Sequence, residues 1–271
     1  MQDRIDRTEA CTLSTVRRAA AMLDLESEQL RDGVALPRGW HFIVLGGETR
    51  RSALRADGFP GFGVPMPDLG LPRLLLAGRE VEYNGDLVVG AAVFRRSWVS
   101  KLDRKDGSTG PIAIVTVRHE LRSAPSALPA IIEEQTYILL GSASERATLT
   151  RPTETVHGQH QKTLVPDETL LFQYSALGFN SHKIHIDRDY ARHTEGLPDL
   201  VVNGGLTTLL MTEFMRLDFG VTPARLSAQH KAPLYCGRPM TLTANQHGST
   251  WKLMVHDDTG VVAVVAEIHA P

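Results

Sequence analysis

Alternating apolar and polar positions, rich in β-branched residues, occur in two separate stretches of the chain and predict two groups of strands. The strands are predicted at 80–100, 112–123, 130–141, 224–235, 239–257 and 261–270. Both groups have three strand segments. The pattern therefore predicts two antiparallel sheets of similar order.

A helical period is clearest at 205–219, where apolar residues recur every three to four positions and predict a mostly buried helix. A second helix is predicted at 8–32, with Ser14 as its N-cap. The apolar run at 171–180 predicts a strand. The many glycines and prolines of 56–78 leave no room for a long regular element before Leu74. Together with the strands, these elements predict an α+β fold.

The two stretches resemble each other weakly, which favours an internal duplication. Leu87-Val88-Val89-Gly90 aligns with Leu234-Tyr235-Cys236-Gly237, and each of these segments leads into further strands. Residues 141–168 between the stretches are polar and lose the strand pattern. We therefore predict a first unit at 1–145, a linker at 146–168 and a second unit at 169–271.

The charge balance and the cysteine content narrow the function classes. The chain has 29 basic and 31 acidic residues, a net charge of −2, which argues against a general nucleic-acid binder. Its two cysteines, Cys11 and Cys236, cannot form a disulfide framework and favour a reducing compartment. Neither a signal peptide nor an apolar run of ~18–20 residues is visible. We expect a cytoplasmic protein without a membrane partner.

The segment FNSHKIHID at 179–187 concentrates the candidate chemistry. Asn180, His182, His185 and Asp187 lie within eight positions of one another. Two histidines and one carboxylate could bind zinc, but no HExxH motif or cysteine pair accompanies them, so we expect no metal. The remaining interpretations are an acid–base site, or histidines that are ordinary solvated loop residues or satisfied core groups.

The segment Asn203-Gly204-Gly205 opens the predicted buried helix. Free backbone N–H groups at a helix N-terminus bind developing negative charge, and glycine allows a ligand to approach them closely. A general base near such a helix start would suit enolate or acyl chemistry. The simpler interpretation is an ordinary helix cap, because Asn and Gly are good N-caps.

Taken together, these segments resemble the MaoC-like type-2 enoyl-thioester hydratases and dehydratases. The family motif reads Asp-x-Asn-Pro-x-His-x-Asp, and Asn180, His185 and Asp187 fall on its first Asp, its His and its last Asp. His182 and Lys183 replace the Asn-Pro pair of the motif.

The second family motif is a His-Gly at the start of the central helix, where this chain has Asn203-Gly204. Most of the chain also resembles the double hot-dog branch, which includes mesaconyl-CoA, itaconyl-CoA and 3-methylfumaryl-CoA hydratases and the mitochondrial type-2 hydroxyacyl-thioester dehydratases. This resemblance implies an α+β double hot-dog fold, two antiparallel sheets each wrapping a central helix, with a degenerate N-terminal unit.

The resemblance also implies reversible hydration of an α,β-enoyl thioester carried by CoA or a carrier protein, without a cofactor. His185 would transfer the proton, the Gly204 amide would stabilise the enolate oxygen, and Asn180 would hold the water. The expected substrate contacts are His182, Asp187, Asn203 and Gly205. Three alternatives stay open: thioester hydrolysis, conjugate addition of an amine, and non-catalytic acyl binding. Monomer and homodimer are both compatible with this fold.

Overall fold

The computed structural model describes residues 3–107, 110–141, 153 and 155–271. The strands are β1 (Ile5–Ala10), β2 (Arg73–Tyr83), β3 (Ala92–Gly107), β4 (Gly110–Arg122), β5 (Ile131–Leu140), β6 (His160–Leu164), β7 (Arg225–His230), β8 (Met240–His247), β9 (Thr250–His256) and β10 (Val262–His269). The helices are α1 (Leu13–Met22), α2 (Glu168–Leu177) and α3 (Gly204–Phe219), with short turns η1 (Trp40–Val44), η2 (Arg51–Ala53), η3 (Lys183–His185) and η4 (Tyr190–Thr194).

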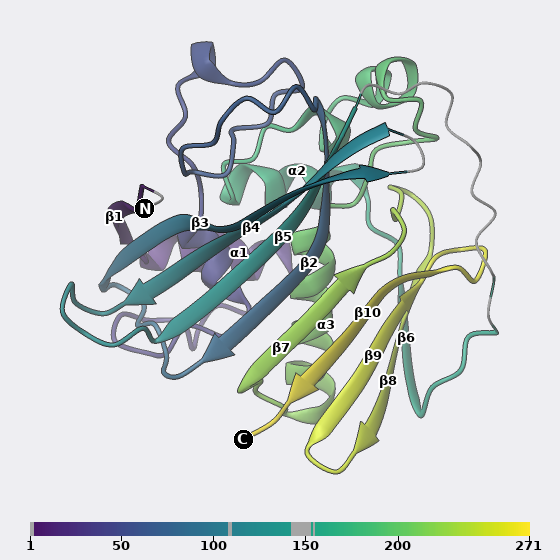
Figure 1. Cartoon of the computed structure of the whole chain (residues 1–271). Coiled ribbons are helices and arrows are strands. Elements are labelled where there is room, and N and C mark those ends of the chain that lie inside the picture. Colours follow the sequence, from purple (N-terminus) through teal and green to yellow (C-terminus); the bar gives the residue numbers. More distant parts are fainter. Residues whose placement is uncertain (1–2, 108–109, 142–152, 154) are drawn as a thin grey trace.

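The strands form one curved antiparallel sheet in the order β1-β3-β4-β5-β2-β7-β10-β9-β8-β6 (Figure 1). The first five belong to the first half of the chain and the last five to the second half. The halves join where β2 pairs with β7, from Gly78 opposite Gln229 to Glu82 opposite Arg225. Two sheets of similar order were predicted, and this pairing makes them one continuous surface.

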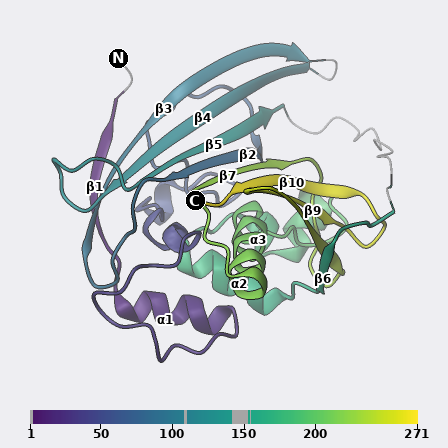
Figure 2. The ribbon, with the colours of Figure 1, turned by 90° about the horizontal axis from the view of Figure 1, so that it is seen from below.

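The three α-helices lie on the concave side of this sheet (Figure 2). Helix α3 is the long central helix predicted at 205–219, and it ends at Gly220, whose positive φ of 65° suits glycine. In the first half the longest helix is α1, with ten residues, so a long central helix occurs only in the second half of the described chain.

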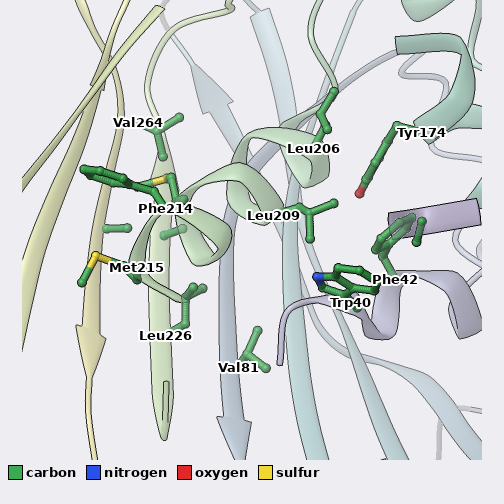
Figure 3. Close-up of a cluster of buried hydrophobic side chains, with 14 of the residues drawn as sticks. Trp40, Phe42, Val81, Tyr174, Leu206, Leu209, Phe214, Met215, Leu226 and Val264 are labelled. Atoms are coloured by element: carbon green, nitrogen blue, oxygen red, sulfur yellow. The ribbon is translucent and has the colours of Figure 1, made fainter. Parts of the chain in front are cut away.

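Helix α3 is buried between the sheet and the segment around η1. In Figure 3, Leu209 of α3 faces Trp40 and Phe42, whereas Phe214 of the same helix lies beside Val264 of the sheet. Each fully buried side chain of this size contributes about 1.5–3 kcal/mol relative to exposure. Because η1 comes from the first half, the two halves share one hydrophobic core.

The weak internal repeat corresponds to equivalent positions in the fold. Val88 forms an isolated bridge with Ala35, and Tyr235 forms one with Val201. Gly90 and Gly237 have positive φ angles of 84° and 73°, a conformation that glycine adopts at little cost. Each of these glycines precedes the strand that continues its own half, β3 or β8.

Two predicted elements are wrong in type or extent. Residues 171–180 were predicted as a strand, but most of them belong to helix α2, whose N-cap Asp167 accepts a hydrogen bond from the Leu170 amide at 2.8 Å. Helix α1 is much shorter than 8–32, and Thr12 rather than Ser14 caps it. The residues before it form β1, because an edge of β3 is available for pairing.

The predicted linker at 146–168 falls partly outside the described residues, since 142–152 and 154 are not among them. Within the described part, His160–Leu164 forms β6, which pairs with β8 from His160 opposite Ala244 to Leu164 opposite Met240. Polar residues suffice for this strand because it is an edge strand and four of its five residues are exposed. The second sheet therefore begins before residue 169.

Candidate active site

A cavity of about 690 Å³ lies at the start of α3 and is lined by residues from both halves of the chain. Of the seven residues predicted from the sequence as site residues, six line it: Asn180, His182, His185, Asn203, Gly204 and Gly205. The tertiary structure thus brings together two segments, 180–185 and 203–205, that are about twenty residues apart in the sequence.

The loop that carries Asn180 is set by the end of α2. The Asn180 amide donates to the Ser175 carbonyl at 2.8 Å, and Phe179 adopts a positive φ of 48° in the turn. The side-chain oxygen of Asn180 accepts from the His182 amide at 3.1 Å. This bond fixes the orientation of the Asn180 amide group and leaves its NH₂ group as the donor at the cavity wall.

His185 is buried on η3 and has one ring nitrogen engaged. Its Nδ1 lies 2.7 Å from the Val201 carbonyl oxygen, which can only accept, so Nδ1 carries the proton. Burial, helped by the neighbouring His182 and opposed by the Val201 carbonyl, lowers the pKa of His185 to about 3. The ring is therefore neutral near pH 7, and Nε2 holds a lone pair that can accept a proton.

His182 lies beside His185, with ring centroids 5.4 Å apart at an interplanar angle of 89°. Its Nε2 is 3.7 Å from Oδ2 of Asp57, a distance that allows electrostatic attraction but is too long for a good hydrogen bond. Burial lowers the pKa of His182, and Asp57 opposes this effect. Asp57 comes from the first half of the chain and was not predicted from the sequence.

The segment around Asp57 is bound to the loop that carries the histidines. The Lys183 amide donates to the Asp57 carbonyl at 2.8 Å, and the Ser181 hydroxyl donates to the Gly58 carbonyl at 2.7 Å. Gly58 has a φ of 77°, and a Cβ on it would overlap the Ser181 carbonyl oxygen. Only glycine permits this close approach, so Gly58 holds Asp57 against the site.

The start of α3 also lines the cavity. Asn203 is the N-cap residue, but its side chain does not cap the helix; its Nδ2 donates to Ser175 Oγ at 3.3 Å. A Cβ on Gly205 would overlap the Tyr174 hydroxyl, and one on Gly204 would lie 2.9 Å from Leu76. The first N–H groups of a helix have no intrahelical acceptor, so this end can bind negative charge.

Asp187 is the one predicted site residue that does not line this cavity. It is exposed, and its Oδ1 accepts from the amide of Tyr190, the first residue of η4, at 2.9 Å. It lies instead at an open surface depression, together with Ser181 and Lys183. Asp187 was predicted as a substrate contact, and its place outside the cavity wall does not support that role.

The first half also contributes polar side chains that were not predicted from the sequence. The cavity wall includes Arg79 of β2 and Gln135 and Tyr137 of β5, and Glu133 lies behind them. In β5 the buried positions alternate from Ile131 to Leu139. Glu133 and Gln135 lie on the same buried face of β5 as these apolar residues. A charged or amide side chain on an otherwise apolar strand face is unusual, and this pattern in the sequence could have identified them.

Comparison with known proteins identifies the family. The family model for hydroxyacyl-thioester dehydratase type 2 matches residues 39–236. The chain belongs to this family. It is 32% identical over 252 residues to the mesaconyl-C(4)-CoA hydratase of Chloroflexus aurantiacus, an alignment that covers 92% of this chain and 89% of that protein. The resemblance predicted from the sequence is confirmed, and with it the enzyme class of hydratases and dehydratases of acyl thioesters.

Solved structures confirm the fold class. HtdX of Mycobacterium tuberculosis superposes with a TM-score of 0.71 at 14% identity, covering 99% of both chains. A second protein of that organism, whose structure is described as a double hot-dog fold, superposes with a TM-score of 0.65 at 14% identity, covering 99% of this chain and 95% of the other. The predicted double hot-dog fold is therefore confirmed.

Across 3–107, 110–141, 153 and 155–271, no group of three or more His, Cys, Asp or Glu side chains is arranged to hold a metal ion. In the same part of the chain, no helix is long and apolar enough to span a membrane.

Proposed function

We propose that the protein catalyses the reversible addition of water to an α,β-enoyl thioester, with His185 as the proton-transfer group. The observation that carries this proposal is the neutral His185, with Nδ1 bound to Val201 and Nε2 free, in the same cavity as the start of α3. The thioester carrier is CoA or an acyl-carrier protein, and the relative named for mesaconyl-C(4)-CoA supports CoA.

In the hydration direction, water lies between Asn180 and His185. The Asn180 NH₂ group donates to the water oxygen, and His185 Nε2 accepts one water proton. The oxygen forms a bond to Cβ of the substrate, and the π electrons of the double bond move onto the thioester oxygen as an enolate. The proton held by His185 is then delivered to Cα, so H and OH have been added and the enzyme is unchanged.

The enolate oxygen would lie against the backbone N–H groups at Gly204 and Gly205. One such donor is typically worth about 3–4 kcal/mol in the transition state. Both positions require glycine, since a Cβ at Gly204 or Gly205 would collide with Leu76 or with the Tyr174 hydroxyl. Asn203 and His182 are polar residues that line the cavity beside the reacting atoms.

Asp57 is proposed as a positioning residue that replaces part of the charge lost with the family aspartate at Asn180. Its carboxylate lies 3.7 Å from His182 Nε2, and His182 in turn packs against His185. A negative charge at this distance favours the protonated form of His182. The sequence places no carboxylate here, because Asp57 lies more than 120 residues before His182.

The test is incubation with a panel of enoyl-CoAs followed by mass spectrometry. Hydration adds 18 mass units (one water), hydrolysis releases free CoA, and conjugate addition gives an amine adduct. We expect hydration, and a fall in turnover of about 10²–10⁴-fold in His185→Ala with the fold intact by circular dichroism.

His193→Ala is the matched control, because His193 is an exposed histidine on η4 outside the cavity wall. It should retain wild-type turnover. Near wild-type turnover in His185→Ala would reject the proposed role, and free CoA or an amine adduct as the main product would replace hydration by one of the two alternatives.

A further inference from the structure

His230 is a polar residue of the cavity wall to which the proposed hydration steps give no role. It is the last residue of β7, the strand through which the second half pairs with β2 of the first half. On the neighbouring strand β10 it lies opposite Val264, and it lines the cavity together with Gly204. A histidine beside the reacting atoms is a candidate for further chemistry, because its ring can donate and accept hydrogen bonds.

The imidazole of His230 lies against the start of α3. A Cβ placed on Gly204 would be 3.2 Å from Cε1 of the ring and 3.3 Å from its Nδ1, and these are the two ring atoms nearest to that point. A side chain at position 204 would therefore push the ring away. The enolate oxygen is proposed to accept hydrogen bonds at this helix start, so Nδ1 lies beside the proposed position of that oxygen.

The other ring nitrogen of His230 shows which one carries the proton. Within the described residues, Nε2 is buried and makes no hydrogen bond. If Nε2 carried the proton, a buried N–H would be left without an acceptor, which folded proteins rarely contain. With the proton on Nδ1, only a lone pair at Nε2 is left unpaired. We therefore assign the proton to Nδ1, on the side of the ring that faces Gly204.

The ring of His230 is neutral near pH 7. Burial lowers the pKa of His230 to about 4, and the positive charge of Arg79 acts in the same direction. A neutral imidazole can polarise a carbonyl through its N–H group without giving up the proton, because the imidazolate that would result is a strong base. The ring is thus in the form that suits a fixed hydrogen-bond donor.

Other buried histidines that line the cavity have partners within the protein. The Nδ1 of His185 lies 2.7 Å from the Val201 carbonyl oxygen, and the Nδ1 of His119 lies 2.7 Å from Ser97 Oγ. In the described part of the chain, neither ring nitrogen of His230 has such a partner. The N–H group of His230 is therefore available to a ligand in the cavity.

We propose that His230 is a further catalytic residue, which donates a hydrogen bond from Nδ1 to the thioester oxygen as this oxygen becomes an enolate. The bond supplements those from the backbone N–H groups at Gly204 and Gly205. The proton stays on Nδ1 throughout, and proton transfer remains with His185. This inference rests on the proposed hydration and adds a side-chain donor from β7 to its oxyanion site.

The test measures kcat and KM of His230→Leu on the enoyl-CoA that the wild type hydrates fastest. Loss of one donor that acts mainly in the transition state typically lowers kcat by about 10²–10³-fold. We expect a fall of about 10²-fold or more in kcat, with KM within about threefold of the wild type. Near wild-type kcat in His230→Leu would overturn the assignment.

His230→Asn tests whether the hydrogen bond itself is what matters. The side-chain NH₂ of asparagine is attached to Cγ, as Nδ1 is in histidine, so it keeps an N–H donor near the same place. We expect His230→Asn to recover at least tenfold of the kcat lost in His230→Leu. An Asn variant as slow as the Leu variant would also overturn the proposed donor.

Thermal melts at pH 7.5 separate catalysis from folding. Leucine at position 230 removes a buried nitrogen that has no partner among the described residues, so the Tm of His230→Leu should equal or exceed that of the wild type. His256→Leu is the matched control. His256 of β9 is also buried, and its Nδ1 has no partner in the described chain, but it lies outside the cavity wall. This variant should keep kcat within about threefold.

The outcomes distinguish this inference from the proposed function. Hydration by the wild type, with kcat unchanged in His230→Leu or with no recovery in His230→Asn, would overturn the role of His230 while hydration stands. A Tm and a kcat that fall together in His230→Leu, without recovery of kcat in His230→Asn, would assign His230 a structural role instead. If no enoyl-CoA gains water with the wild type, the proposed function itself fails.

Discussion

Acid should unfold this protein through histidines that are buried in the neutral form. Burial lowers the pKa of His185 to about 3, from an ordinary value of 6.5. Burial likewise lowers the pKa of His119 to about 4 and that of His230 to about 4. Because these values lie below that of the unfolded chain, the unfolded chain binds protons first as the pH falls. The stabilisation is complete above pH ~6.5 and is lost progressively down to pH ~3–4.

The size of the effect follows from these shifts. At pH 5 the pH is about 1.5 units below the pKa of a histidine in the unfolded chain, whereas the buried histidines of the folded protein are still neutral. Each such histidine therefore lowers the free energy of unfolding by about 2 kcal/mol. His185 and His119 are both buried, so together they remove about 4 kcal/mol, and His230 adds a loss of the same sign. A typical domain has only about 5–15 kcal/mol of net stability.

The assay is urea denaturation followed by circular dichroism between pH 7.5 and pH 5. We expect the free energy of unfolding to fall by about 4–6 kcal/mol from pH 7 to pH 5. The unfolded His119→Asn variant takes up one proton fewer than the wild type. The free energy of unfolding should therefore depend less steeply on pH in this variant, by about 1.4 kcal/mol per pH unit. His247→Asn, at an exposed position, is the matched control and should keep the wild-type slope. A free energy of unfolding that is the same at pH 7 and pH 5 would refute this account of the buried histidines.

Two substitutions test the cavity directly. Asn180→Asp keeps the acceptor for the His182 amide and adds a carboxylate; we expect hydration to be retained with a new acidic limb in its pH–rate profile, read by product mass. A wild type that never adds water, beside a variant that does, would favour conjugate addition instead. Gly205→Ala drives a methyl group into the Tyr174 hydroxyl and should lower the free energy of unfolding by about 1–3 kcal/mol. Tyr174→Phe in the same chain should restore most of this loss in thermal melts, and an unchanged melting temperature in Gly205→Ala would contradict the close approach of Tyr174 to Gly205.

The sequence alone determined the fold class and the family, and it predicted which segments form the candidate site. Strand periodicity and the apolar stripe of 205–219 are local patterns, so they predicted the antiparallel sheets and the buried helix α3. The spacing of Asn180 and His185 and the Asn203-Gly204-Gly205 helix start carried the family resemblance, which the family match confirms. The same local patterns were wrong for 171–180, where an apolar run satisfies both a strand and a helix and only the Asp167 cap and the packing of α2 decide.

Only the tertiary structure decided which groups from the first half reach the site. Asp57 lies against His182 because Gly58 permits the contact with Ser181, and Arg79 lies against Gly205 because β2 pairs with β7. Such contacts join residues more than 120 positions apart, and no local period encodes them. The protonation state of His185 is also a tertiary property, since it follows from burial and from the Val201 carbonyl. A sequence specifies which side chains can react, but the folded chain sets their distances, partners and solvent.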